Sequence, residues 1–286
     1  MKHAILITAY KDLDMLSPII EYFDEDFVFY IHVDKKCSES VDFLTSYSNV
    51  HLYTNYRVDW GGYNHLKTIV LLAENALRDE QVSYFHLITG ADFPIRPLSE
   101  FKRYFECNRE RNYLEYFTLP RPSWGSEGGL DRILYYWLLP STRYHCGRYI
   151  RKVVNIQRKL KLIRPFPFFE GRIYGGGTYW SVSRRAVSCL MQYIEENPAY
   201  LKRFRWTSIA EEVCFPTFWI NSGLVFENDS LRYIDWSDPT APAMLTERDY
   251  DAMMSSTAFF ARKMQKGISD ALIAKIVADN DKNNIR

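Results

Sequence analysis

The first hundred residues alternate between short apolar runs and amphipathic segments, and this alternation leaves few architectures open. The apolar runs lie at 4–9, 27–33, 50–53 and 85–89, and the helical spacings lie at 15–22, 62–77 and 98–105. Strands that alternate with helices predict a parallel sheet, because parallel neighbours need long crossovers that cover both faces. We therefore expect an α/β fold with a Rossmann-like, mostly parallel central sheet.

The second half of the chain is less regular. Strands are expected at 113–117, 178–182 and 231–236, and helices at 184–196, 209–220, 247–255 and 268–278. Gly175–Gly177 is expected to turn into the strand at 178–182, as a hairpin or bulge or to let backbone approach a ligand. The polar tail from Asp279 is expected to fray. No repeat or Gly/Ser linker divides the chain, so 1–286 is predicted to be one domain.

Charge and cysteine content exclude several classes of protein. The formal net charge is +1, whereas a general nucleic-acid binder needs a broad basic face. The five cysteines are scattered without a CxxC pair, which argues against zinc and a disulfide framework and favours a reducing compartment. MKHAILITAY is interpreted as a first strand, not a signal peptide, and no apolar run approaches the roughly 20 residues of a membrane span. These observations predict a cytoplasmic protein.

Two aspartates follow predicted strands at the same edge of the sheet. Asp34 ends the run IHVD, and Asp92 lies in FHLITGADFPIRP. Ligands of open α/β sheets bind beyond the carboxyl ends of the strands, so both carboxylates are candidates for a nucleotide site. The alternative for each is a capping or turn residue. Asp24-Glu25-Asp26, a formal DxD match, precedes a strand and is therefore interpreted as a solvated turn rather than a metal site.

Glu211 and Glu212 open a predicted helix, and Arg262-Lys263 follow an apolar pair in FFARKM. Adjacent helical residues point about 100° apart, so one glutamate can face a cleft where burial raises its pKa toward that of a general base. The alternative is acids placed by the helix dipole. The basic pair can stabilise a leaving diphosphate without a metal, or it can be ordinary surface charge. The histidines, including His65, show no ligand spacing and are expected to pack.

A basic segment runs from Arg143 to Arg164, with eight Lys or Arg residues and no acid, and PFPFF follows it. Such a segment can rest peripherally on the cytoplasmic face of an anionic membrane. A solvated helix is the alternative.

Six motifs, in order, resemble the core-2/I-branching β-1,6-N-acetylglucosaminyltransferase family, which also contains the peptide O-xylosyltransferases. The motifs are IHVDKK, VDWGGYNHLKTIVLLAENAL, LITGADFPI, GGGTYWSVSRRAV, IAEEVCFPTF and FFARKM. The resemblance implies a GT-A fold, a UDP-sugar donor, inversion at the anomeric carbon, and no metal or cofactor. It implies a donor half at 1–110, an acceptor and catalytic half at 111–286, and a bacterial member acting in polysaccharide biosynthesis on a glycan or lipid-linked glycan.

The same resemblance assigns roles by position. Glu212 is the general base, Thr8, Ala9, Asp34, Asp92, Arg262 and Lys263 bind the donor, and Glu115, Glu211, Tyr179, Trp180 and Trp236 contact the acceptor. The family often carries a second basic residue near the position of Ala243, and Arg262 or Arg248 is the candidate replacement here. The donor sugar is expected to be N-acetylglucosamine, with xylose, glucose or galactose as alternatives. A non-catalytic nucleotide- or carbohydrate-binding module is the rival class.

Overall fold

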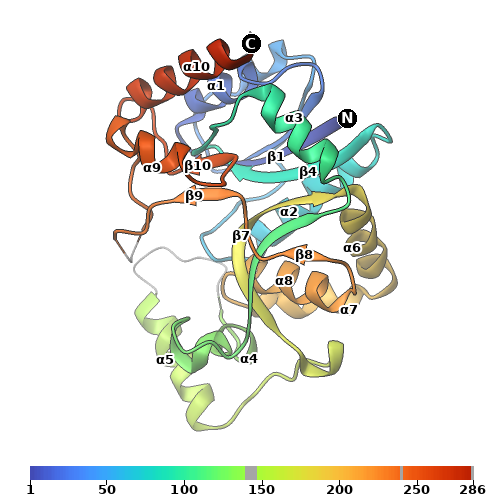
Figure 1. Ribbon diagram of the computed structural model, residues 1–286. Coiled ribbons are helices and arrows are strands. Elements are labelled where there is room, and N and C mark those ends of the chain that lie inside the picture. Colours follow the sequence, from blue (N-terminus) through green and yellow to red (C-terminus); the bar gives the residue numbers. More distant parts are fainter. Residues whose placement is uncertain (139–146, 239–240, 285–286) are drawn as a thin grey trace.

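The central sheet carries the predicted alternation into space. The computed structural model describes residues 1–138, 147–238 and 241–284. Seven strands pair in the order β3-β2-β1-β4-β7-β6-β8 (Figure 1). They are β1 (Lys2–Ala9), β2 (Phe27–Val33), β3 (Val50–Tyr53), β4 (Val82–Thr89), β6 (Asn112–Thr118), β7 (Tyr174–Ser183) and β8 (Phe226–Glu227).

The first four strands of this order are parallel, and β7 runs antiparallel to both β4 and β6. A second, three-stranded sheet has the order β5-β10-β9, with β5 (Asp92–Pro94), β10 (Phe260–Arg262) and β9 (Arg232–Ile234). The predicted α/β class with a mostly parallel, Rossmann-like sheet is therefore confirmed.

Helices cover both faces of the central sheet (Figure 1). They are α1 (Leu16–Glu21), α2 (Tyr63–Leu77), α3 (Leu98–Cys107), α4 (Asp131–Leu134), α5 (Gly147–Lys159), α6 (Arg184–Glu196), α7 (Pro198–Arg203), α8 (Glu211–Asn221), α9 (Tyr250–Met254) and α10 (Asp270–Asn284). Single 3-10 turns include η3 (Ser126–Gly129), η6 (Phe204–Trp206) and η7 (Glu247–Asp249). Helices α2, α6, α7 and α8 share one hydrophobic core, and α1, α3, α9 and α10 share the other.

Strand β1 shows why the cores lie on both faces. Ala4 and Leu6 pack into one core while Ile5 and Ile7 pack into the other, and all four are fully buried. A strand buried on both faces has a continuous apolar run, and this is the sequence pattern at 4–9.

Two local expectations need correction. Gly175–Gly177 do not form a hairpin turn but lie within β7, beside a bulge where β7 advances from Gly176 to Trp180 while β6 advances only from Tyr116 back to Leu114. The bulge offered as an alternative is therefore confirmed. A Cβ on Gly176 would lie 2.0 Å from the carbonyl oxygen of Glu115, so the strands approach too closely for a side chain. The tail from Asp279 continues α10 to Asn284, and within it Asp279 accepts a 2.8 Å hydrogen bond from the Tyr250 hydroxyl.

Candidate active site

The carboxyl ends of β1, β2 and β4 meet at one edge of the sheet. Gly90 donates to the Thr8 carbonyl at 3.1 Å, and the Asp34 amide donates to the Ala9 carbonyl at 2.8 Å. A Cβ on Gly90 would lie 3.3 Å from the Cβ of Ala9, so the absence of a side chain lets these strand ends converge. The predicted donor residues Thr8, Ala9 and Asp34 therefore share one edge.

Asp34 is already engaged in the structure of its own loop. Its Oδ1 accepts from the Lys36 amide at 2.9 Å and from the Val58 amide at 3.3 Å, and Lys36 Nζ lies 3.6 Å from Oδ2. These contacts are those of the turn residue that was the alternative for Asp34. Contact between its Oδ2 and a nucleotide stays a prediction.

Asp92 and Arg262 face each other across the second sheet. They are direct partners in the β5–β10 pairing, and Asp92 Oδ1 lies 3.7 Å from Arg262 Nη1. The other oxygen, Oδ2, accepts from the amide and hydroxyl of Thr89 at 2.5 and 2.6 Å. Asp92 is fully buried, so its carboxylate is not open to a ligand and can affect the site only through its contact with Arg262.

The Arg262 guanidinium is held in place, but two of its nitrogens have no hydrogen-bond acceptor among the described residues. It lies 4.4 Å from the centroid of the Tyr179 ring, a cation–π contact. Its Nε and Nη1 are buried and make no hydrogen bond to any residue the structure describes. Buried unsatisfied donors are costly, and the anion nearest to Nη1 is Asp92 Oδ1, which also makes no hydrogen bond to the described residues.

Lys263 adds a second positive charge beside Arg262. Burial lowers the pKa of Lys263, and the nearby charges of Lys11 and Arg262 lower it further. The Lys263 amide points to the Ala243 carbonyl at 3.4 Å. Ala243, near which the family often carries a second basic residue, therefore lies beside Lys263. Arg248 is exposed in η7, whereas Lys11 and Arg262 are the cations that act on Lys263.

An unusual backbone turn sets the start of α8. Ile209 has a φ of 49°, a left-handed conformation that is rare for a β-branched residue. The Ile209 amide donates to the Gly61 carbonyl at 2.9 Å, which ties this turn to the loop before α2. Pro216 has no N–H to donate to the carbonyl of Glu212 four residues earlier, so the first turn of α8 is open there. Strain of this kind is typical of functional sites.

Glu212 pairs with a cation that the sequence prediction missed. Its Oε2 accepts from Arg132 Nη1 at 2.7 Å, and the Arg132 guanidinium lies 3.8 Å from the Trp124 ring centroid. Burial raises the pKa of Glu212 to about 7; Arg132 opposes the rise, while Glu211 and Glu115 add to it. The side chain is 25% exposed, so solvent or a ligand can reach it. A pKa near 7 is the range expected of a general base, and that role of Glu212 stays a prediction.

Glu211 turns to a different partner and is only 3% exposed, so the predicted contact between Glu211 and the acceptor needs correction. Its Oε1 lies 2.8 Å from His65 Nδ1, and His65 Nε2 lies 3.4 Å from the Thr8 hydroxyl. Burial alone would lower the pKa of His65, but the Glu211 carboxylate outweighs it and raises that pKa. His65 was expected only to pack; instead it links α8 to the end of β1.

Three of the other predicted acceptor residues are accessible, and one lies in the core. Glu115 is exposed beside the β7 bulge, Tyr179 is half-buried under Arg262, and Trp236 is 58% exposed. Trp180 is a correction, because its side chain is 1% exposed and packs edge-on against Trp219 in the core. We therefore exclude Trp180 from the site. The side chains alternate along β7, so Tyr179 and Trp180 cannot both face an acceptor.

Comparison with known proteins decides the family. The Core-2/I-Branching enzyme family model matches residues 4–260. The chain belongs to the Core-2/I-Branching enzyme family. Xylosyltransferase 2 of Rattus norvegicus is 25% identical over 75% of this chain and 24% of its own length. Xylosyltransferase 1 of Mus musculus is 22% identical over 94% of this chain and 29% of its own length.

This Core-2/I-Branching chain thus spans about a quarter of the length of these curated relatives. The predicted resemblance to this family is therefore confirmed. A putative glucose-1-phosphate thymidylyltransferase from Bacillus anthracis, solved with sucrose, superimposes with a TM-score of 0.33 at 12% identity. That alignment covers 79% of this chain and 86% of the other.

The DxD match lies away from this edge. Asp24 and Asp26 both bind Lys102 at the amino end of β2, in the turn that the sequence predicts. Within residues 1–138, 147–238 and 241–284, no three His, Cys, Asp or Glu side chains are grouped to hold a metal. Among the helices described, none has the length and apolar character of a membrane span.

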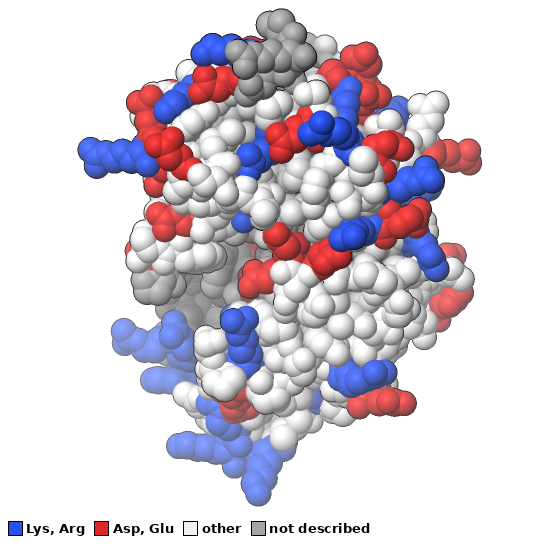
Figure 2. Space-filling view, in the orientation of Figure 1, with Lys and Arg blue, Asp and Glu red and all other residues white. Residues whose placement is uncertain are grey.

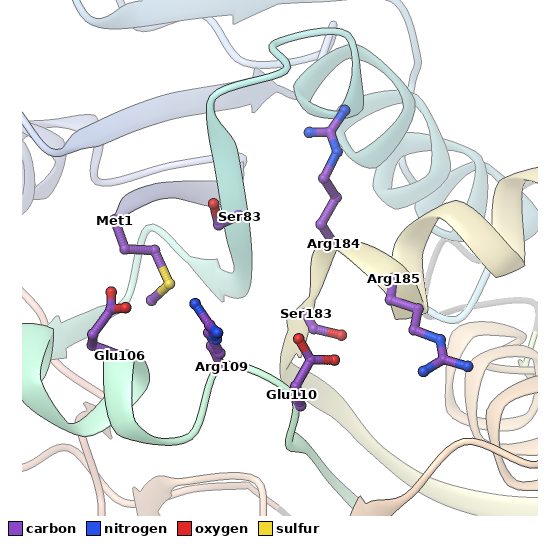
Figure 3. Close-up of a pocket in the computed structure, with 8 residues that line it drawn as sticks. All are labelled: Met1, Ser83, Glu106, Arg109, Glu110, Ser183, Arg184 and Arg185. Carbon is purple, nitrogen blue, oxygen red and sulfur yellow. The ribbon is translucent and has the colours of Figure 1, made fainter.

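An open recess of about 450 Å³ lies at the opposite edge of the sheet (Figure 3). Ser83 at the start of β4 and Arg184 at the start of α6 line it, whereas the candidate site begins at the other end of β4. Arg184 is already bound by the carbonyls of Leu77, Asp79 and Val82. The recess is therefore separate from the candidate active site.

Proposed function

We propose that this chain is an inverting, metal-independent glycosyltransferase that moves a sugar from a UDP-sugar to a hydroxyl of a glycan acceptor. Residues 1–110 form the donor half and 111–286 the acceptor and catalytic half. The observation that carries the proposal is the partly exposed Glu212 carboxylate with its pKa raised to about 7. A simple binding module has no need of a base at that pKa.

Contacts connect the base to the cations. Glu211, adjacent to Glu212, contacts His65, and His65 contacts Thr8. Thr8 is the register partner of Thr89, whose amide and hydroxyl hold the Asp92 carboxylate opposite Arg262. This continuous route supports a single site in which one end accepts a proton and the other binds an anion.

The proposed reaction is a direct displacement. Glu212 takes the proton of an acceptor hydroxyl, and that oxygen forms a bond to the anomeric carbon while the bond to the UDP oxygen breaks. The negative charge that develops on the diphosphate is stabilised by Arg262 and Lys263, with Lys11 nearby. Preorganised cations take the role that a divalent metal has in other phosphate sites, so EDTA should leave the rate unchanged.

The donor sugar is proposed to be N-acetylglucosamine, as the family resemblance implies. Similarity to xylosyltransferases supports UDP-xylose as the alternative, and UDP-glucose and UDP-galactose remain in the comparison. The acceptor is proposed to be a glycan or a lipid-linked glycan. Each UDP-sugar can be compared by its shift of the thermal unfolding midpoint before turnover is measured.

Glu212→Gln tests the function. The variant should bind UDP as the wild type does. Its rates of sugar transfer and of donor hydrolysis should both fall by about 10²–10⁴-fold, the usual contribution of a general base. Glu195→Gln, an exposed acid on α6, is the matched control. Wild-type turnover by Glu212→Gln would refute the assignment of the base. Binding of UDP-sugars without hydrolysis or transfer by the wild type would favour the binding module.

A further inference from the structure

Helix α5 exposes an apolar stripe to water. Tyr149, Val153, Ile156 and Leu160 recur at helical spacing and are between 36% and 67% exposed. Leu162 and Ile163, just beyond the helix, continue the stripe and are more than half exposed. Single exposed apolar residues are ordinary, but a contiguous stripe marks a surface that another phase or partner covers.

The stripe is distinct from the face that holds α5 to the body of the protein. Ile150, Val154 and Gln157 form the buried face, and the Gln157 side chain binds the backbone of Tyr136 in both directions at 2.8 and 2.9 Å. At about 100° per residue, the centre of the exposed stripe lies roughly 100° around the helix from the buried one. The helix is therefore docked already and still presents a second apolar face.

Cations border the stripe on its other side. Arg148, Lys152 and Lys159 are exposed and follow the helix next to it, and residues 147–164 contain no acid. Figure 2 shows Lys and Arg side chains gathered at the lower left, where Figure 1 places α5. Going around α5, the order is buried face, exposed apolar stripe, basic row.

We propose that this face of α5 binds the surface of an anionic phospholipid bilayer, with the helix lying in the headgroup plane. An apolar stripe beside a basic row is the arrangement of interfacial helices, whose apolar side enters about 5–10 Å while cations contact the headgroups. A second copy of this chain fits less well, since a two-fold contact brings like rows of charge together. A nucleic acid would neutralise the cations but leave the stripe in water.

The proposed membrane face adjoins the acceptor side of the candidate site. Arg158 of α5 binds Glu127 of η3, and η3 leads directly into α4, which carries Arg132 and hence the contact to Glu212. A bilayer under α5 would bring a lipid-anchored acceptor toward Glu212. This orientation step rests on the proposed function, whereas bilayer binding itself does not.

Vesicle co-sedimentation of the full chain tests bilayer binding without donor or acceptor. We compare vesicles of pure phosphatidylcholine with vesicles of equal parts phosphatidylcholine and phosphatidylglycerol. Each basic residue near an anionic surface strengthens binding roughly fivefold, so Arg148→Gln/Lys152→Gln/Lys159→Gln should bind on the order of 100-fold more weakly. Ile156→Asp/Leu160→Asp should reduce binding at least as much, because charge enters the apolar stripe.

The matched control is Arg103→Gln/Arg185→Gln/Lys275→Gln, which removes three exposed cations from α3, α6 and α10. This control should bind anionic vesicles within about threefold of the wild type, because its changes lie outside the basic row. Equal losses in both triple variants would refute a localised surface. Absence of wild-type binding to anionic vesicles, or equal binding to neutral ones, would also overturn the proposal. So would a wild type that self-associates through α5, as shown by the α5 variants, and does not bind vesicles. Circular dichroism confirms that each variant is folded.

Discussion

Removal of the Arg132 charge should move the pH dependence of catalysis upward. Arg132 Nη1 lies 2.7 Å from Glu212 Oε2, and the two side chains are 20% and 25% exposed. Arg132 lowers the pKa of Glu212 against the larger effect of burial, and the balance is a pKa of about 7. Arg132→Gln removes the opposing effect and keeps burial, Glu211 and Glu115, all of which raise the pKa.

The magnitude follows from the geometry. A cation within about 4–6 Å lowers a carboxyl pKa by roughly 1–3 units, and partial exposure places this pair toward the lower end of that range. The pKa of Glu212 should therefore rise from about 7 to roughly 8–9 in the variant. At pH 7 the ionised fraction falls from about one half to roughly 1–10%, which corresponds to a loss of about 5–50-fold in rate.

The measurement is kcat/KM against pH, which reports the ionisation of the free enzyme. The wild type should show a rising limb centred near pH 7, and Arg132→Gln should show the same limb displaced upward, with most of the rate recovered above pH 9. Arg132→Lys keeps a positive charge and should stay close to the wild-type limb. An equal loss at every pH, or an unmoved limb, would refute the electrostatic role of Arg132.

Three further predictions follow from individual residues. Glu212→Gln should unfold at a higher temperature than the wild type at pH 8 but not below pH 4.5. The reason is that the pKa of Glu212 is raised from 4.5 to about 7 in the folded protein, so the wild type loses up to about 3 kcal/mol of unfolding free energy as the pH rises through that window. Lys263→Met should weaken UDP binding on the order of tenfold or more by calorimetry, whereas Lys275→Met should leave it unchanged. Gly176→Ala should cost roughly 2–4 kcal/mol of unfolding free energy, because the new Cβ meets the backbone of Glu115. Gly177→Ala should cost about 1 kcal/mol or less, because its Cβ meets only the Glu115 side chain. Chemical denaturation measures both free energies.

The central sheet could be predicted because its signals are local. The apolar runs at 4–9, 27–33 and 85–89 became β1, β2 and β4, and the helix at 184–196 has the predicted bounds. For the glycines of β7 the sequence left a hairpin turn and a bulge open, because nothing in GGGTYW itself reveals that Glu115 and Pro216 press on that strand. The close approach is a tertiary fact, and the freedom of glycine fits a turn and a bulge equally well.

The site was predictable in its residues and less so in its partners. Two adjacent acids on one helix predict that one faces a cleft, and Glu211 and Glu212 do point to different partners. Arg132 and His65 are 80 and 146 residues away from their glutamates, so no spacing rule could pair them. Trp180 failed for a simpler reason, since neighbours on a strand face opposite sides and only one of Tyr179 and Trp180 could reach the site.

The burial of Asp92 changes the role that its motif suggests. As the carboxylate at a strand end it looks like a ligand of the donor, yet both oxygens face protein: one binds Thr89 and the other faces Arg262. A fully buried anion needs a charge partner, and Arg262 supplies it at 3.7 Å while keeping Nε and Nη1 free of hydrogen bonds to the described residues. We therefore propose that the run LITGADFPI holds Arg262 in place for the diphosphate of the proposed donor. On this argument Asp92→Asn should weaken UDP binding only when Arg262 is present, and a double-mutant cycle with Arg262→Gln measures that coupling.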